Sequence, residues 1–368
     1  MNILIDAHVF DDKHQGTRTY LKGLYSELIP LAKDWNFFMV ANDIANLKDE
    51  FGEHANVTYI PLKSHNKFYR LLVELPAIIR KYNIDYSHYQ YVGTPIKAGK
   101  QIITTHDILF EQKEFKSYFP FKYRLTNSFL FKRSAKHADV LLTVSKYSRH
   151  KISELYDIPL ETIHVTPNAV HANFKRHSFQ EASNGILDLG KYILYVARIE
   201  PRKNHLALLK AFTELQLAQK GYKLVFIGRK DIPNPELEAY NAKSKPINGD
   251  AVVWLDSIPN DELASYYQHC ELFVFPSFAE GFGIPPLEAM ATGCKLLCSK
   301  NTAMADFNLP ESLTFDPYNV GELKLKMQQQ LNTDEVLVDM YNKILEKYNW
   351  NRVAADFFGL IHEHYKNS

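Results

Sequence analysis

The sequence predicts an α/β protein of two domains, each built on a parallel sheet with helices on its faces. Three observations predict this class. At 368 residues, the chain is too long for one ordinary domain and suits two. Apolar runs of strand length alternate with helical periodicity, and the alternation restarts after a polar, irregular stretch at residues 172–190. The apolar share of 46% is enough to fill two cores.

The composition argues against several functional classes. Lys plus Arg number 43 and Asp plus Glu number 42, a balance that gives no support for nucleic-acid binding. Cys270, Cys294 and Cys298 form no CxxC pair, which is typical of core residues in a reduced, cytosolic protein. The chain starts directly with a strand-like MNILIDA, and no apolar run approaches the ~20 residues of a membrane span. We therefore expect a cytoplasmic protein without a signal peptide.

The first half of the chain opens with a strand in residues 2–10, a polar loop containing Gly16, and a helix in residues 19–32. The free N–H groups of such a loop and the N-terminus of the next helix form a natural anion site. An ordinary strand–helix turn would show the same pattern. Further elements are predicted as strands in 37–42, 57–62, 86–93 and 101–110 and as a helix in 68–82.

The strand in residues 101–110 brings His106 and Asp107 to its carboxyl end, where ligands of open α/β sheets bind. A histidine at a strand end is often only a hydrogen-bonded structural residue, and an aspartate there is often a cap. We expect His106 to lie at the sheet edge and to face a loop of the second domain. This position favours a site role for His106 and, less strongly, for Asp107.

Residues 113–136, KEFKSYFPFKYRLTNSFLFKRSAK, combine basic and aromatic side chains. An ordinary helix with a solvated basic face explains this composition. A surface that meets anionic lipid or a lipid-linked acceptor on the inner face of the membrane explains it as well. The sequence leaves both interpretations open.

In the second half, a strand that begins at residue 191 ends in a charged loop with Arg198, Arg202 and Lys203, followed by a helix. Three cations beside a helix N-terminus attract anions, and together they can neutralise a diphosphate. Taken alone, the same residues also fit a solvated turn. We expect them to project towards the same sheet edge as a glutamate farther along the chain, Glu280.

Residues 272–299 read as a buried strand LFVF, a glycine loop, a helix that starts at tandem prolines and ends at Gly293, and a second strand. Glu280 follows the strand, and Glu288 is expected in the first helical turn. Helix-dipole compensation and a solvated loop charge would explain the two carboxylates without any site. A dinucleotide-binding fingerprint is rejected, because Pro286 stands where its third glycine is needed.

These motifs carry a resemblance. AEGFGIPPLEAMATG is similar to the E-x7-E signature of the retaining family 4 glycosyltransferases, and ARIEPRKN resembles their phosphate-binding element. The resemblance implies the GT-B fold, with two facing Rossmann-like domains at 1–175 and 185–348. It also implies a C-terminal helix, residues 350–366, that packs back on the first domain. NTAMADF at 301–307 departs from the glycine-rich loop usual in the family.

The resemblance also assigns residues. It implies that Glu280 and the backbone that follows it hold the donor sugar, and that Glu288 binds the ribose. It places a histidine like His106 near the reacting sugar and the loop at Ile258 near the base. The remaining donor-side candidates are Gly16, Arg198, Arg202, Lys203, Gly281, Phe282, Gly283 and Ile284, and those on the acceptor side are Thr17, Arg18 and Asp107.

The implied activity is retaining transfer of a hexose from a GDP- or UDP-sugar to a glycan or lipid-linked acceptor, with mannose favoured. Catalysis is assigned to Glu280, His106, Lys203 and Arg198. No cofactor is expected, and the sequence contains no D-x-D run for a metal-held diphosphate. Two alternatives remain open from sequence: a sugar-nucleotide epimerase of similar fold, and a non-catalytic subunit that binds nucleotide sugars.

Overall fold

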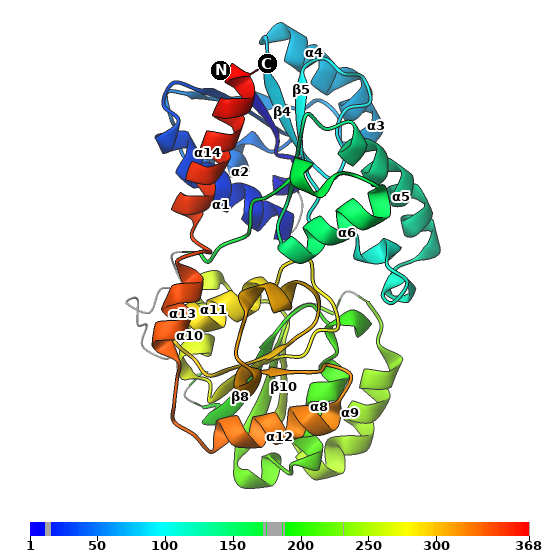
Figure 1. The fold of residues 1–368 in the computed structure, drawn as a ribbon. Coiled ribbons are helices and arrows are strands. Elements are labelled where there is room, and N and C mark those ends of the chain that lie inside the picture. The colour runs from blue at the N-terminus through cyan, green and yellow to red at the C-terminus, as the bar shows by residue number, and fades with distance from the viewer. Residues whose placement is uncertain (12–15, 172–173, 175–185, 187, 231, 368) are drawn as a thin grey trace. The chain divides into compact units, whose positions relative to one another are not determined.

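The protein is described by a computed structural model covering residues 1–368 except 12–15, 172–173, 175–185, 187, 231 and 368 (Figure 1). The chain divides into two compact units. The first comprises Met1–Ala169 and Tyr348–Ser368, and the second comprises Val170–Lys347. The predicted linker at 172–190 falls largely outside the described residues.

The first unit is a parallel sheet of seven strands in the order β3-β2-β1-β4-β5-β6-β7. Its strands are β1 (Asn2–Asp6), β2 (Asn36–Ala41), β3 (Val57–Pro61), β4 (Tyr86–Gln90), β5 (Lys100–Thr104), β6 (Val140–Thr143) and β7 (Ile163–Val165). Its helices are α1 (Gly16–Leu31), α2 (Ile44–Phe51), α3 (Lys67–Tyr69), α4 (Leu75–Lys81), α5 (Phe121–Lys136), α6 (Lys146–Tyr156) and α14 (Trp350–Lys366). Because the strand order reverses between β1 and β4, this sheet has the topological switch point typical of ligand-binding α/β folds.

The helix predicted at 68–82 contains one irregularity. A π-helical turn (Arg70–Glu74) separates α3 from α4. Pro76 sits just after this turn and lacks the N–H that would bond the carbonyl of Leu72 in an α-helix. The wider turn is one way in which a helix accommodates such a proline.

The second unit is a parallel sheet of six strands in the order β10-β9-β8-β11-β12-β13. Its strands are β8 (Lys191–Val196), β9 (Tyr222–Ile227), β10 (Val252–Leu255), β11 (Leu272–Phe275), β12 (Leu296–Ser299) and β13 (Thr314–Phe315). Its helices are α8 (His205–Glu214), α9 (Pro235–Asn248), α10 (Asn260–His269), α11 (Ile284–Thr292), α12 (Val320–Leu331) and α13 (Val338–Leu345). The central strands are buried on both faces, as their continuous apolar sequences predict.

The C-terminal helix α14 packs along α1 in the first unit, as Figure 1 shows. Trp350, at its start, is buried and lies edge-on to Tyr20 of α1. Its ring lies so close to Gly23 that a Cβ built at that glycine would be 2.0 Å from it. The chain therefore returns to the domain in which it began, and Gly23 is needed for that return.

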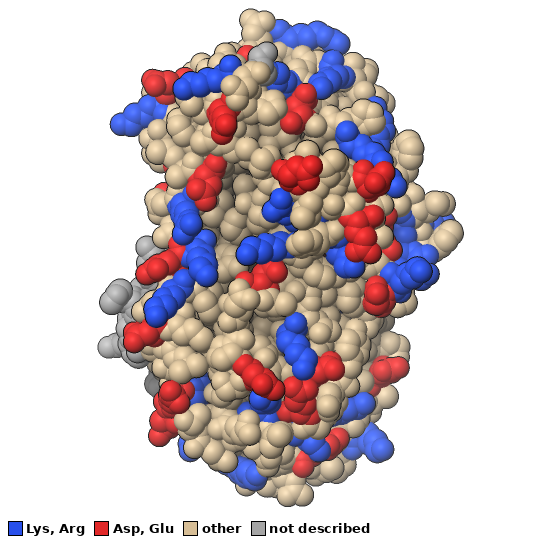
Figure 2. Space-filling view, in the orientation of Figure 1, with Lys and Arg blue, Asp and Glu red and all other residues tan. Residues whose placement is uncertain are grey.

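The surface in Figure 2 shows Lys and Arg interspersed with Asp and Glu, in keeping with the near-zero net charge. The three cysteines are free, with Cys294 and Cys298 buried and Cys270 half-buried. None of the helices in the described part of the chain combines the length and apolar character needed to cross a bilayer.

Candidate functional site

Three site candidates of the second unit, Arg202, Lys203 and Glu280, meet at the carboxyl ends of β8 and β11. These strands are parallel neighbours, with Leu272 opposite Ile193. The two loops that leave them are tied together, because the Phe278 N–H donates to the Arg202 carbonyl at 3.0 Å. Adjacent parallel strands deliver their following loops to one edge of a sheet. This is why residues 77 or 78 positions apart in sequence come into contact here.

Glu280 is the centre of this cluster. Its Oε1 accepts hydrogen bonds from the Lys203 ammonium and the Ser277 hydroxyl, both at 2.6 Å. Its Oε2 accepts one from Arg202 Nη1 at 3.2 Å. Its backbone N–H donates to the Thr302 hydroxyl at 2.9 Å. The glutamate is only 7% exposed, so this carboxylate is held in one orientation.

Arg202 is occupied mainly with holding the loops in place. Its Nη1 also donates to the Ala279 carbonyl, and its Nη2 donates to Glu200 Oε1, both at 2.5 Å. The guanidinium thus bridges two carboxylates and a main-chain carbonyl while lying almost completely buried. This geometry favours a positioning role for Arg202 over the diphosphate contact predicted for it. Glu200, from the same ARIEPRKN element, is thus a structural partner of Arg202.

The charges in this cluster determine how its members titrate. Burial alone would raise the pKa of Glu280, but the charges of Lys203 and Arg202, with hydrogen bonds from Lys203 and Ser277, lower it to about 2. Burial lowers the pKa of Lys203, and the adjacent Glu280 opposes that shift. Glu280 is therefore an ionised acceptor of hydrogen bonds with little basicity.

Glu288 lies apart from this cluster, on α11. Its Oε2 accepts a hydrogen bond from the Tyr267 hydroxyl of α10 at 2.8 Å. Burial raises its pKa to about 7, even though the Tyr267 hydroxyl acts in the opposite direction. The expected position in the first helical turn is wrong: α11 begins at Ile284, so Glu288 is one turn further on.

The loop between Glu280 and α11 is shaped by its glycines and prolines. Gly283 has a φ of +101°, which disfavours any residue with a Cβ, and it serves as the N-cap of α11. Pro285 and Pro286 occupy the first turn, where missing N–H groups are tolerated. The backbone amides at this helix start therefore come from the loop and from Ile284. Gly281 and Phe282 are buried, the latter against Phe307.

Two other predicted residues of this unit lie on neighbouring loops. Arg198 is exposed two residues beyond β8, and Ile258 is half-buried on the loop that follows β10. Their roles in donor binding stay predictions. A cavity of about 440 Å³ opens nearby, at the carboxyl ends of β9 and β10, with Ile199, Trp254 and Asp256 among its lining residues.

His106 lies in the first unit, just beyond β5, and is 7% exposed. Its Nε2 donates to the Gln90 side-chain oxygen at 2.7 Å, and its ring packs edge-on to Tyr20. Burial lowers its pKa to about 3, so the imidazole is neutral at physiological pH. The structure thus places His106 at the predicted sheet edge as a neutral, oriented ring. Whether it contacts a sugar stays a prediction.

The other first-unit candidates are Gly16, Thr17, Arg18 and Asp107. Gly16 is the exposed first residue of α1, and Thr17 beside it is half-buried. Arg18 is buried: its Nη2 binds Glu50 at 2.7 Å and its guanidinium lies over a phenylalanine ring. The Asp107 carboxylate accepts a hydrogen bond from the Leu109 N–H at 3.1 Å. These contacts favour structural roles for Arg18 and Asp107 over the acceptor contacts predicted for them.

Sequence reasoning missed several residues that build the site. Ser277 and Thr302 bind Glu280, and Tyr267 binds Glu288. Asn204, with a φ of +55°, donates to the carbonyls of Pro276 and Pro317 and so ties three segments together. The sequence could have suggested a role for Asn204, because it is the last residue of the EPRKN motif. The hydroxyl residues have no sequence signal, because ordinary loops are rich in them.

Within the described residues, no three His, Cys, Asp or Glu side chains gather in a way that could hold a metal ion. His362 and His364, which the sequence separates onto different faces of the last helix, have separate contacts. His362 stacks on Phe358, and His364 Nδ1 bonds the Tyr86 hydroxyl at 2.7 Å. Metal-independent chemistry stays a prediction.

Residues 177–347 match the family model described as glycosyl transferases group 1, and residues 19–174 match the model described as glycosyltransferase family 4. The two models together cover most of both units, including all of the site candidates of the second unit.

Curated relatives and a solved structure agree with these matches. The O-antigen chain mannosyltransferase B of Escherichia coli is 27% identical over 80% of this chain and 84% of its own length. The serotype-specific mannosyltransferase WbdA of the same species is 30% identical over 60% of the chain, which spans only 28% of that longer protein. The sucrose-phosphate synthase of Thermosynechococcus elongatus superposes with a TM-score of 0.76, at 19% identity, covering 100% of this chain and 99% of the other.

Proposed function

The chain belongs to the family 4 glycosyltransferases and has their GT-B fold, and from this we propose that it is a retaining enzyme that transfers a hexose, with mannose favoured, from a nucleoside diphosphate sugar to a glycan or lipid-linked acceptor. One observation carries the proposal. A buried, ionised Glu280 is clamped by Lys203 and Arg202 at the carboxyl edge of the second sheet. This arrangement combines a hydroxyl-binding carboxylate with a cation for the leaving group.

The leaving group is the first task of this site. Breaking the bond between the sugar and the diphosphate builds negative charge on the departing phosphate. The Lys203 ammonium has three donors, and the Glu280 carboxylate takes one of them. We assign its remaining donors to the phosphate, with the N-terminus of α11 adding a favourable dipole. Arg202 then acts through Glu280, by keeping its carboxylate in place.

The sugar and the ribose need acceptors of hydrogen bonds. Because the pKa of Glu280 is about 2, its carboxylate stays ionised and accepts hydrogen bonds from sugar hydroxyls at any physiological pH. The same low basicity makes Glu280 a poor covalent nucleophile and a poor general base. Glu288, on the separate helix α11, is assigned to the ribose hydroxyls.

These assignments support transfer with retention. The bond from the anomeric carbon to the phosphate oxygen breaks, and a bond to the acceptor oxygen forms on the same face of the sugar. The proton of the acceptor hydroxyl passes to the departing phosphate, so no protein base is required. His106, neutral and oriented by Gln90, is assigned to positioning the sugar.

The cavity beside the site supports a guanine base. It is reached from the ends of β9 and β10, and Asp256 is exposed at its rim. A carboxylate complements the N1–H and N2–H donors that guanine presents side by side, whereas uracil offers only one N–H between two carbonyls. This favours a GDP-sugar. A GDP-sugar agrees with mannose as the favoured sugar and with the names of the curated relatives, which are mannosyltransferases.

The test is a thermal-shift panel of GDP-, UDP- and ADP-sugars, followed by NMR of the product formed from the stabilising donor. A donor at 100 times its Kd should stabilise the fold by about 2.7 kcal/mol. We expect GDP-mannose to raise the Tm most, Asp256→Asn to reduce that rise selectively, and the new linkage to keep the donor's α configuration. A product of inverted configuration would overturn the retaining mechanism. No stabilisation by any nucleotide sugar would overturn the donor assignment.

The family matches set aside the two alternatives that the sequence left open, since both models describe glycosyltransferases. The NMR experiment still distinguishes them in practice. An epimerase would convert the donor sugar without any acceptor, and a binding subunit would leave it unchanged.

A further inference from the structure

A second histidine lies behind His106 on the same face of the first sheet. His88 and Gln90 belong to β4, and Thr104 ends the neighbouring strand β5, two residues before His106. Side chains two positions apart on a strand point to one face of the sheet. Gln90 and Thr104 are register partners of the two parallel strands. These four polar side chains therefore form one patch below the carboxyl edge of the sheet.

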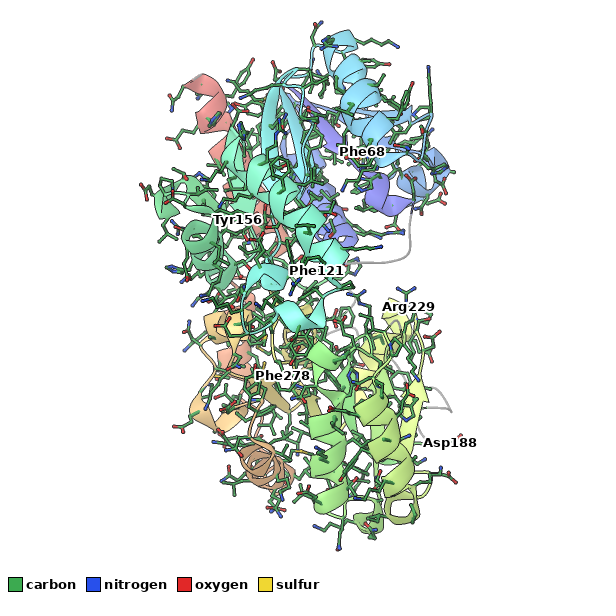
Figure 3. All side chains as sticks on the ribbon, turned by 90° about the vertical axis from the view of Figure 1, so that its right-hand side faces the viewer. Phe68, Phe121, Tyr156, Asp188, Arg229 and Phe278 are labelled. Carbon is green, nitrogen blue, oxygen red and sulfur yellow. The ribbon has the colours of Figure 1, made fainter. Side chains whose placement is uncertain are left out.

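The patch faces the helices α1 and α14. The Tyr25 hydroxyl of α1 lies 2.7 Å from His88 Nδ1, and the ring of Phe357 of α14 stacks on His88. Figure 1 shows α1 and α14 on the side of this unit away from α5, and in Figure 3, where Phe121 of α5 is turned to the viewer, α14 lies on the far side. His88 is 0% exposed, so it cannot contact a substrate itself.

A continuous chain of hydrogen bonds joins the two histidines. His106 Nε2 lies 2.7 Å from Gln90 Oε1, and Gln90 Nε2 lies 3.2 Å from His88 Nε2. The Thr104 hydroxyl lies 2.7 Å from the same nitrogen of His88, and the Tyr25 hydroxyl ends the chain at His88 Nδ1. All five side chains are buried. One amide is thus held between two imidazole rings.

The donors and acceptors of this chain determine where each proton lies. A side-chain amide oxygen only accepts and its nitrogen only donates, so His106 carries a proton on Nε2 and His88 Nε2 is bare. Burial lowers the pKa of both histidines to about 3, so each neutral ring holds a single proton. His88 therefore holds its proton on Nδ1 and donates it to the Tyr25 hydroxyl. The two histidines are opposite tautomers.

The tautomers of the two histidines are coupled through the Gln90 amide. If the amide were turned over, its NH2 group would face His106 and its oxygen would face His88. Both histidines would then have to move their proton to the other ring nitrogen. His88 Nε2 would also have one N–H for two neighbours, the amide oxygen and the Thr104 hydroxyl. As a bare nitrogen it can instead accept from both, which favours the arrangement found.

The free nitrogen of His106 is the functional end of this chain. Within the described part of the molecule, His106 Nδ1 has no hydrogen-bond partner. The ring is 7% exposed at the carboxyl edge of the sheet and lies against the rings of Tyr20 and Tyr91. A bare ring nitrogen accepts a hydrogen bond from a hydroxyl, whereas it offers nothing to a phosphate oxygen or a carbonyl. The tautomer thus determines which ligand group can bind.

We propose that His88 is a positioning residue for sugar transfer, because through Gln90 it fixes His106 in the tautomer whose bare Nδ1 accepts a hydrogen bond from a substrate hydroxyl. His88 acts only through the amide, and Tyr25 and Thr104 hold His88 in turn. The identity of the substrate rests on the proposed function. The two tautomers are properties of the protein without ligand and can be measured independently of it.

The first experiment is NMR of the full chain, without donor, with ¹⁵N-labelled histidine rings. We expect His106 to be protonated on Nε2 and His88 on Nδ1. His88→Phe keeps a ring that can stack on Phe357 and removes the acceptor of the Gln90 amide, so both tautomers of His106 should appear. The same tautomer at both positions of the wild type, or a single unchanged tautomer of His106 in His88→Phe, would overturn the proposal.

The second experiment is the rate of transfer with the identified donor. His88→Phe should lower kcat by about 10–100-fold, as loss of a hydrogen-bond partner behind an active-site group typically does. His88→Gln should keep most of the activity, because its side-chain oxygen can accept from the Gln90 amide. Equal kcat in His88→Phe and the wild type would overturn the proposal.

Ile152→Val is the matched control for lost stability, because Ile152 is fully buried on α6 of the same unit. It should lower the Tm without changing kcat or the tautomer of His106. A fall in kcat that follows the Tm equally in this control and in His88→Phe would show a purely structural role for His88 and overturn the proposal. Absence of transfer in the wild type would contradict the proposed function instead, and the NMR result would then decide the histidine network alone.

Discussion

At the scale of single residues, Glu280 shows how a buried carboxylate can be kept ionised. Three side chains, Lys203, Arg202 and Ser277, bind its two oxygens. Burying an ion without such partners would be prohibitive, and removal of one partner from a buried pair typically costs about 3–5 kcal/mol. In the proposed mechanism, the same partners set the orientation in which Glu280 meets a sugar. Structural and functional roles are therefore coupled at this residue.

Lys203→Met tests the leaving-group role. Loss of one charge-assisted donor should lower kcat by a factor of about 10²–10³, which corresponds to roughly 2.7–4 kcal/mol. The Tm should fall as well, because Glu280 keeps only Arg202 and Ser277. The measurement is steady-state transfer with the identified donor. Lys220→Met, at the amino edge of the same sheet, is the control and should have neither effect. Unchanged kcat in Lys203→Met would remove Lys203 from the mechanism.

Glu288 should make both stability and donor binding depend on pH. In the unfolded chain its pKa is 4.5, and burial raises it to about 7 in the folded state. Between these values the folded protein holds one proton more, so this residue makes the free energy of unfolding fall as pH rises through the window. The ionised form accepts ribose hydroxyls best, so the donor KM should fall as pH rises through 7.

Glu288→Gln should abolish both of these trends and raise the donor KM more than it lowers kcat, since ribose contacts are alike in ground and transition states. Urea titrations and initial rates across the pH range provide the two measurements. A loss confined to kcat would contradict the ribose assignment.

At the scale of elements, the packing of α14 on α1 depends on a position that has no side chain, Gly23. Gly23 lies in the middle of α1, where a glycine is unfavourable by roughly 0.5–1 kcal/mol relative to alanine. Its position is explained by Trp350, whose ring fills the space that a Cβ would need. Packing between two helices has here outweighed the intrinsic propensity of one of them.

Gly23→Ala should therefore destabilise the first unit by about 1–3 kcal/mol, because the Trp350 ring must move. Gly359→Ala, on the exposed side of α14, meets nothing within 4 Å and should stabilise by roughly 0.5–1 kcal/mol. Opposite shifts of the urea midpoint in the two variants would agree with this account. Equal stabilisation by both would show that α14 does not pack tightly at Trp350 in solution.

The sequence predicted elements better than contacts. Apolar runs and periodicity located the strands LFVF and KYILYV, and tandem prolines and Gly293 bounded α11 correctly. The π-helical turn before Pro76 gave no periodic signal. The motifs also predicted that Glu280 and Lys203 lie at one sheet edge, where the structure joins them. They could not reveal that Arg202 bridges two carboxylates, because one of those contacts spans 78 positions. The hydroxyl partners of Glu280, Ser277 and Thr302, could not be predicted either, because loop hydroxyls carry no sequence signal.

At the scale of the whole molecule, the chain builds its first domain from both ends. It leaves the first unit at Ala169 and returns at Tyr348, while everything between belongs to the second unit. Composition and length predicted two cores, and the resemblance predicted the returning helix. Overall charge does not reveal local charge, since a chain with a net charge of +1 contains a helix, α5, with five basic residues and no acidic one.

The central claim is that Glu280 holds the sugar of the donor. The measurement that tests it most directly is calorimetric titration of the wild type and Glu280→Gln with the nucleotide sugar and with the parent nucleoside diphosphate. We predict that Glu280→Gln weakens binding of the nucleotide sugar by at least about tenfold more than binding of the diphosphate, as expected for a lost hydrogen bond to a charged group. An equal effect on both ligands, or none on either, would contradict the account.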